Sequence, residues 1–133
     1  MWHNIIVKNM WENINMTVSS QDEVVFYLAK VKRLLADNKY DFVPRKVNLE
    51  ALAELGWALD YFFKDYLMQL TLLNYVNGPE TDRDDYDEDV WVFGDDIETD
   101  QYYIKIKIRT HVKQEVVCIS FHKAKFPLNF PWK

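Results

Sequence analysis

The segment Tyr102–Arg109 limits the possible folds more than any other part of the chain. Hydrophobic and polar side chains alternate along it without a break, which is the pattern of a β-strand with one buried face and one open face. Tyr102 and the isoleucines would lie on the buried face. The open face would carry Tyr103, Lys105, Lys107 and Arg109. Because the chain has a net charge of -5, this gathering of cations on one side of a strand needs an explanation.

A second alternating segment, Val116–His122, follows after a short loop, and we predict that the two strands form a hairpin. Residues that lie opposite each other in a hairpin share a face, so the register decides which side chains meet. With a four-residue loop the pairs on the open face are Tyr103 with His122, Lys105 with Ser120, and Lys107 with Cys118. The same register brings the isoleucines against Val117, Ile119 and Phe121 in the core.

The open face of this hairpin suggests chemistry on a phosphate group. Histidine exchanges protons near neutral pH, and lysine is a compact cation that stabilises phosphate charge. Metal-independent RNA cleavage needs an acid, a base and such a cation around the ribose 2′-hydroxyl and the scissile phosphate. The alternative is an ordinary solvent-facing sheet surface on which lysines protect against aggregation. The pattern leaves both interpretations open.

The composition indicates one ordered domain. The chain has 133 residues, 49% of them hydrophobic and 16% aromatic, which is enough for a sizeable core without disulfides or metals. Its single cysteine, Cys118, excludes an internal disulfide and a cysteine zinc site, and we expect it to be a packed, unreactive side chain. The most apolar stretch, 55–73, is interrupted by Asp60, Lys64 and Asp65, so it predicts a core helix and no membrane span. We expect a cytoplasmic protein.

Helical patterns fill the first half of the chain. Ser20 and Glu23 predict a capping box for a helix over 21–37. Asn48 is predicted to cap a second, short helix, with a third helix over 58–70. The predicted buried residues of the second helix are Leu49, Leu52 and Leu55.

Strand patterns fill the second half. Val90–Phe93 is a predicted strand that Gly94 ends, and the hairpin follows it. Helices followed by strands indicate an α+β fold, with N-terminal helices packed on a C-terminal antiparallel sheet. We place this single domain at residues 20–133 and treat residues 1–19 as an N-terminal extension.

An acidic run, Asp82–Asp89, separates the two halves. Carboxylates alternate at positions 85, 87 and 89, but the glycine and the distal glutamate of a helix-loop-helix calcium loop are missing. We therefore expect a solvated loop or a surface for a basic partner. No metal site or other cofactor is predicted. Arg83 is the only cation in the run.

Several short motifs follow one another in a distinctive order. They are the Val31–Leu35 helix segment, Gly78–Asp84, Gln101–Ile106 and Ile119–His122. Over about residues 22–133 this order resembles the MqsR-type toxins of bacterial type II toxin–antitoxin systems. The resemblance implies a RelE-like fold, metal-independent cleavage of mRNA, and inhibition by a cognate antitoxin of the helix-turn-helix class.

The resemblance also implies roles for individual residues. The family's strand tyrosine falls on Tyr103, its companion lysine on Lys105, and its late-strand lysine on His122, so these are the expected catalytic residues. A family lysine and a family glutamine fall on Asn77 and Val92, which supply neither group. The expected RNA contacts are Lys107, Arg83, Arg45 and Lys46.

A second hypothesis is a toxin-fold protein that has lost catalysis and binds another protein. Its contacts would come from the acidic run, which could mimic nucleic acid, or from the apolar tail 123–133. A phage-borne or regulatory role would fit such a binding module. An adjacent gene for a small helix-turn-helix antitoxin would favour the ribonuclease, and its absence would favour the binding module.

Overall fold

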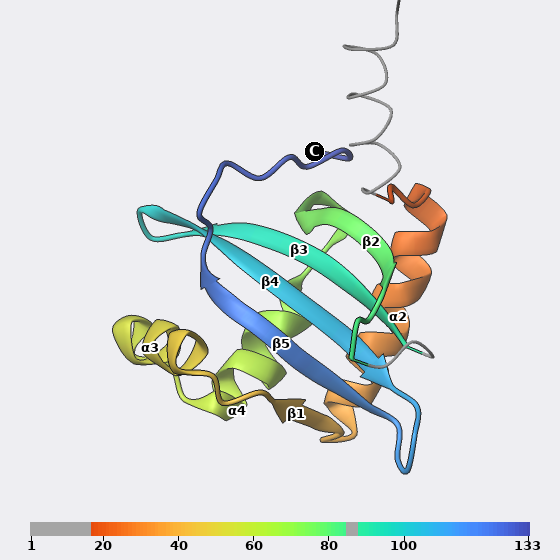
Figure 1. Ribbon diagram of the computed structural model, residues 1–133, viewed down its shortest axis with the longest axis horizontal. Coiled ribbons are helices and arrows are strands. Elements are labelled where there is room, and N and C mark those ends of the chain that lie inside the picture. Colours follow the sequence, from red (N-terminus) through yellow and green to blue (C-terminus); the bar gives the residue numbers. More distant parts are fainter. Residues whose placement is uncertain (1–16, 85–87) are drawn as a thin grey trace, which may run out of the picture.

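The computed structural model describes residues 17–84 and 88–133. In chain order its helices and turns are α2 (Gln21–Ala36), α3 (Lys46–Leu55), α4 (Leu59–Tyr61), η1 (Phe62–Tyr66), η2 (Leu67–Gln69) and η3 (Leu72–Asn74). Its strands are β1 (Tyr40–Phe42), β2 (Tyr75–Thr81), β3 (Asp89–Ile97), β4 (Asp100–Arg109) and β5 (Glu115–Lys123). Within the described residues these strands form one sheet in the order β1-β5-β4-β3-β2. Figure 1 shows α2 and α4 behind the strands, which confirms the predicted α+β class.

The sheet is mixed, and the prediction of an antiparallel sheet is wrong at one edge. β1 pairs in parallel with β5, with Phe42 opposite Cys118, whereas the other three pairings are antiparallel. Three residues offer too little alternation to be identified as a strand. Tertiary packing holds β1 in place, since the Phe42 ring meets those of Phe62 and Phe63 edge-on.

Helix α2 begins as predicted. The Ser20 hydroxyl accepts a hydrogen bond from the Glu23 backbone N–H at 3.2 Å, and the Glu23 carboxylate accepts one from the Ser20 N–H at 2.9 Å. The helix buries one face against the sheet, where the Tyr27 ring stacks on Trp91 with centroids 4.0 Å apart. The buried residues of α2 are Val24, Tyr27, Leu28, Val31, Leu34 and Leu35.

Asn48 does not cap a helix, which corrects the sequence prediction. Helix α3 begins at Lys46, and Asn48 lies in its first turn, fully buried. Its side-chain amide donates to the carbonyls of Val43 at 3.0 Å and Ile119 at 2.9 Å, and its carbonyl oxygen accepts from the Phe121 N–H at 3.1 Å. Turning Asn48 inward rotates the helix, so that Ala51 and Leu52 are buried while Leu49 is 48% exposed.

The predicted third helix is helical but irregular. A turn of α4 widens into the π-helical η1 and then tightens into the 3-10 helix η2. The wide turn accompanies the complete burial of two consecutive rings, Phe62 and Phe63. No helix in the described parts of the chain combines the length and the apolarity that crossing a bilayer requires.

β2 contains a glycine and a proline, residue types that commonly mark turns. Gly78 and Pro79 lie inside the strand, joined by a cis peptide bond. The described end of the N-terminal extension lies along this strand: Val18 forms a parallel bridge to Gly78, and the Ser19 hydroxyl donates to the Gly78 carbonyl at 2.7 Å. Contacts from the extension therefore help to hold this segment in an extended conformation.

β3 also continues beyond its predicted end at Gly94 and reaches Ile97. A Cβ atom at Gly94 would lie 2.4 Å from Leu128 Cδ1. The glycine is therefore a point of close packing between the sheet and the C-terminal tail, and it does not end the strand.

We expect Asn48→Ala to lower the free energy of unfolding by about 2–4 kcal/mol, because it removes three buried hydrogen bonds and leaves backbone groups of β5 without partners. Urea denaturation measures this loss. Asn129→Ala is the matched control, since Asn129 is exposed, and it should change stability by less than about 0.5 kcal/mol. Equal stability of the two variants would contradict the role of Asn48.

Candidate active site

The hairpin of β4 and β5 has the predicted register in the half that lies away from the hairpin loop. Tyr103 lies opposite His122, and Lys105 lies opposite Ser120. Between Lys105 and Ile106 the register shifts by one residue, which leaves Ile119 as the extra residue of a β-bulge. Tyr103, Lys105, Ser120 and His122 therefore share the open face of the sheet, as the sequence predicted.

Beyond the bulge the register prediction is wrong. Cys118 lies opposite Ile106, and Lys107 lies opposite Val117, because one extra residue sends every following side chain to the other face. Cys118 is completely buried in the core, and burial raises the pKa of its thiol. This confirms that Cys118 is a packed side chain and makes it a poor nucleophile.

Tyr103 and His122 form a stacked pair. Their ring centroids are 5.4 Å apart and their planes differ by 19°. His122 Nδ1 lies 2.9 Å from the Lys123 carbonyl oxygen, which can only accept a hydrogen bond, so Nδ1 carries the proton and Nε2 of the neutral ring is left as an acceptor. Burial, together with the charge of Glu80, raises the pKa of Tyr103. The phenol therefore stays protonated and can donate.

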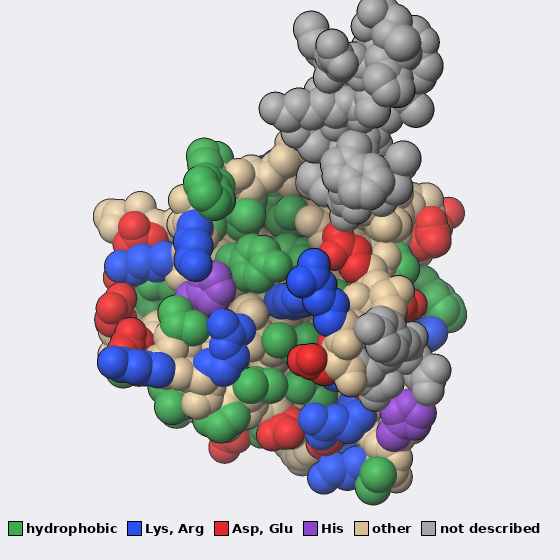
Figure 2. Space-filling model, in the orientation of Figure 1, with side chains coloured by type: hydrophobic (Ala, Val, Ile, Leu, Met, Phe, Trp, Pro, Cys, Tyr) green, Lys and Arg blue, Asp and Glu red, His purple; other side chains and the backbone are tan. Residues whose placement is uncertain are grey.

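Two cations extend this pair along the open face. Lys105 lies directly opposite Ser120, and Arg45 Nη1 donates a hydrogen bond to the Ser120 hydroxyl at 3.2 Å. Arg45 comes from the residue before α3, so the helix that Asn48 anchors also delivers this guanidinium. Within the described residues no carboxylate forms an ion pair with Lys105 or Arg45. Figure 2 shows basic side chains, a histidine and hydrophobic side chains gathered over β4 and β5 on this face.

Lys107 lies on the same strand but is occupied by carboxylates. Its ammonium is 2.6 Å from Asp82 and 2.9 Å from Glu88, and the side chain is only 12% exposed. Glu88 also accepts hydrogen bonds from the backbone N–H and the hydroxyl of Thr110. These contacts make Lys107 a structural cation and a poor candidate for the predicted RNA contact.

The acidic run is therefore only partly the solvated loop that the sequence predicted. Asp82 and Glu88 fasten two points of it to β4 through Lys107. Positions 85 and 87, two of the three alternating carboxylates of the run, lie outside the described residues. In the described ranges no cluster of three or more histidine, cysteine or acidic side chains is arranged to hold a metal ion.

The remaining predicted RNA contacts, Lys46 and Arg83, lie outside the group formed by the stacked pair, Lys105 and Arg45. Lys46 is 91% exposed on its side chain and lies 3.8 Å from Glu50, one turn along α3. Arg83 follows the end of β2. In the part of the chain that the structure describes, no hydrogen bond or ion pair joins Arg83 or Lys46 to the groups around His122.

The two departures from the family pattern fall in the same row of the sheet as Lys105. Asn77 lies opposite Val92 on β2 and β3, and Val92 lies opposite Lys105 on β4. Since directly paired residues share a face, Asn77, Val92 and Lys105 belong to one line across four strands. That line ends at Ser120.

Sequence reasoning missed the contribution of the tail. The backbone N–H groups of Ala124 and Leu128 donate to the backbone carbonyl and the side-chain carbonyl of Gln101, each at 2.7 Å. The intervening residues close a hollow of about 350 Å³ beside Tyr103 and His122. The apolar composition of the tail indicated packing, but no pattern marked Gln101 as its anchor.

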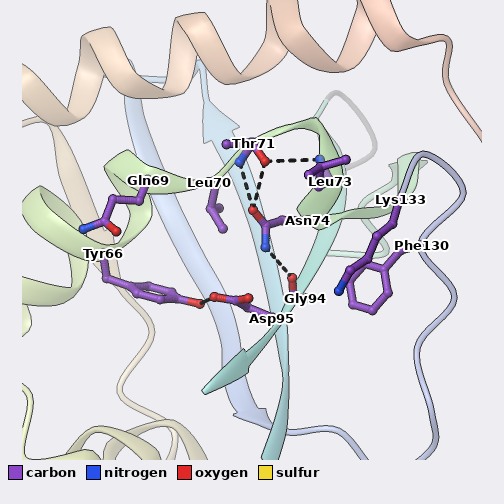
Figure 3. Close-up of a pocket in the computed structure, with 10 residues that line it drawn as sticks. All are labelled: Tyr66, Gln69, Leu70, Thr71, Leu73, Asn74, Gly94, Asp95, Phe130 and Lys133. Atoms are coloured by element: carbon purple, nitrogen blue, oxygen red, sulfur yellow. Dashed lines mark hydrogen bonds between the residues drawn. The ribbon is translucent and has the colours of Figure 1, made fainter. Parts of the chain in front are cut away.

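A second hollow, of about 340 Å³, lies between the η turns, β3 and the end of the tail, and Figure 3 shows its lining. Its main polar groups already have partners. The Tyr66 hydroxyl donates to Asp95 at 2.7 Å, and the Asn74 side chain accepts from the Thr71 N–H and donates to the Gly94 carbonyl. The hollow contains no predicted site residue, and the satisfied groups suit a structural role.

The Glu88–Lys107 pair predicts a loss of stability in acid. Burial alone raises the pKa of Glu88, but the hydrogen bonds from Thr110 and Lys107 outweigh it and lower the pKa from 4.5 to about 2. A lowered folded-state pKa stabilises the fold above the unfolded value and is lost as the carboxylate is protonated. Thermal unfolding should therefore show stability falling between about pH 4.5 and about pH 2.

Glu88→Gln should flatten this part of the pH profile and lower the stability at neutral pH. Glu50→Gln is the control, because among the described residues Glu50 pairs only with an exposed lysine on α3, and its profile should match that of the wild type. A Glu88→Gln profile as steep as the wild-type profile would contradict the assignment.

No protein-family model, no curated protein and no solved structure matches this chain. The resemblance to MqsR-type toxins therefore rests on the short sequence motifs alone. The chemistry of the open face carries the functional argument.

Proposed function

We propose that this chain is a metal-independent endoribonuclease that cleaves mRNA, the toxin component of a type II toxin–antitoxin system with a RelE-like fold. The observation that carries this proposal is the stacked Tyr103–His122 pair with Lys105 and Arg45 beside it on one open sheet face. A proton acceptor, a proton donor and two cations are the groups that metal-independent RNA cleavage requires.

The geometry supports a division of roles. His122 Nε2 takes the proton of the ribose 2′-hydroxyl, because the Lys123 carbonyl occupies Nδ1. The 2′-oxygen then attacks the phosphorus in line. The protonated Tyr103 phenol gives its proton to the leaving 5′-oxygen, and Lys105 and Arg45 stabilise the charge on the phosphorane. The products are a 2′,3′-cyclic phosphate and a 5′-hydroxyl, so no water or metal enters this step.

The proposal extends to the protein's setting. A toxin of this kind acts on mRNA in the cytoplasm and needs a cognate antitoxin to restrain it. We place the antitoxin, of the helix-turn-helix class, over the open face of β4 and β5, because that face carries the catalytic groups and would be blocked by a partner. Arg83 and Lys46 remain proposed contacts to the RNA backbone outside the central group.

One observation favours the alternative of a catalytically inactive binding module. Asp82 and Glu88 remove Lys107 from the cationic surface, and Asn77 and Val92 add no charge to the same row. The open face is therefore less basic than its sequence suggests. A module of this kind would contact another protein, and it would leave RNA intact.

Replacing His122 tests the proposed chemistry directly. We expect the wild-type protein, freed of antitoxin, to cleave single-stranded RNA in the presence of EDTA. His122→Ala should lower the rate by on the order of 10²–10⁴-fold, the usual contribution of an acid–base group. His111→Ala, in the hairpin loop, is the matched histidine control and should retain activity. Expression in bacteria should arrest growth with loss of mRNA, and His122→Ala should abolish the arrest.

The contrary result is also informative. Harmless expression of the wild type, together with the absence of cleavage of every RNA tested, would refute the ribonuclease and leave the binding module.

Replacing Lys105 tests the phosphate contact. Lys105→Ala should weaken RNA binding and reduce the dependence of log affinity on log salt concentration by about one unit, because one fewer counterion is released. Lys32→Ala, at a partly exposed position of α2, is the matched control and should leave the slope unchanged. Fluorescence anisotropy with labelled RNA over a series of salt concentrations measures both slopes. An unchanged slope for Lys105→Ala would remove this lysine from the site.

A further inference from the structure

The hollow formed by the C-terminal tail lies directly against the proposed catalytic pair. Tyr103 and His122 form one side of it, and the segment Ala124–Leu128 forms the other. Its volume of about 350 Å³ falls at the small end of the range for small-molecule sites, roughly 300–1,000 Å³. It therefore suits one small planar group. Its lining is mostly apolar and aromatic, with Lys125 as a cation on the side of the tail.

Two contacts hold this hollow open. Gln101 binds the tail on both sides of the hollow, through its backbone carbonyl to the Ala124 N–H and through its side chain to the Leu128 N–H. The Leu128 side chain packs onto Gly94, where a Cβ atom would come within 2.4 Å of it. Only glycine leaves room for this approach, so the sheet itself is shaped to receive the tail.

Phe126 is the most exposed aromatic residue of the tail segment that lines the hollow. Its side chain is 79% exposed, and within residues 17–84 and 88–133 no aromatic ring or cation contacts it. Phe26 on α2 is also exposed, at 66%, but the Lys30 ammonium lies over its ring, 4.8 Å from the centroid. An exposed aromatic face next to the stacked Tyr103–His122 rings is a surface on which a planar ligand can stack.

We infer that this hollow binds one unpaired nucleobase of single-stranded nucleic acid, next to the phosphate that is cleaved; the inference rests on the proposed function. Stacking on Phe126 and on the rings of Tyr103 and His122 would hold the base. Lys125 and Lys105 would hold the phosphates on its two sides. A base in a duplex is stacked and paired and cannot enter, so the hollow selects single-stranded substrate.

Binding without cleavage tests this inference. The probe is a single-stranded deoxyribo-oligonucleotide with one 2-aminopurine base, which lacks the 2′-hydroxyl that the proposed reaction needs and therefore stays intact. We expect the wild-type protein to bind it and to quench the 2-aminopurine fluorescence by stacking. Phe126→Ala should weaken binding on the order of tenfold, the size of one stacking contact, and should reduce the quenching.

The controls separate stacking from other effects. Phe26→Ala removes an equally large exposed ring from the opposite side of the sheet and should bind and quench like the wild type. Phe126→Tyr keeps a ring and should also retain both properties. The exposure of Phe126 means that its replacement should leave the melting temperature unchanged, which excludes unfolding as the cause of weaker binding.

The outcomes distinguish this inference from the proposed function. Quenching that depends on Phe126, in a protein that cleaves no RNA, would support the base site and refute the ribonuclease. Cleavage of RNA with equal binding by Phe126→Ala and Phe26→Ala would support the ribonuclease and refute the base site. Absence of oligonucleotide binding by the wild type would refute the base site as well.

Discussion

The side chain of Asn48 is the contact on which the arrangement of this protein depends. It bonds to the backbone of β5 at Ile119 and Phe121, immediately past the point where β1 stops pairing with that strand. These groups lie where a longer β1 would have satisfied them, and one of them, the Ile119 carbonyl, belongs to the extra residue of the bulge. The bulge places Ser120 and His122 on the open face while Cys118 stays in the core. The same helix brings Arg45 to Ser120.

The net positive charge of the open face depends on which of its cations form ion pairs with carboxylates, and not simply on how many cations it contains. Lys107 is matched by Asp82 and Glu88 in a largely buried group, which fastens the acidic run and is costly to break because each partner would leave a buried charge. Lys105 and Arg45 remain as the local cations. An anionic chain can bind a polyanion through such a local patch, because salt screens charges that lie beyond about 10 Å.

Sequence patterns predicted the elements with strong local signals. The capping box of α2 and the pairing of Tyr103 with His122 depend on neighbouring residues or on strict alternation, and both are confirmed. The errors fall where distant segments decide. Asparagine is a residue type that commonly caps helices, yet the Asn48 side chain bonds to the backbone of β5. Gly94 is a residue type that commonly ends a strand, yet β3 continues past it to Ile97, and Leu128 of the distant tail packs against it.

The sequence by itself determined the α+β class, the open face of β4 and the chemical types that lie on it, because periodicity assigns side chains to faces without knowledge of the partner. Only the tertiary structure decided which of those groups are available. It buried Lys107 between two carboxylates, brought Arg45 to Ser120, and folded the tail over Gly94 beside His122. The physical reason is that these contacts join residues far apart in the chain, and their energies depend on burial and distance, which no local pattern encodes.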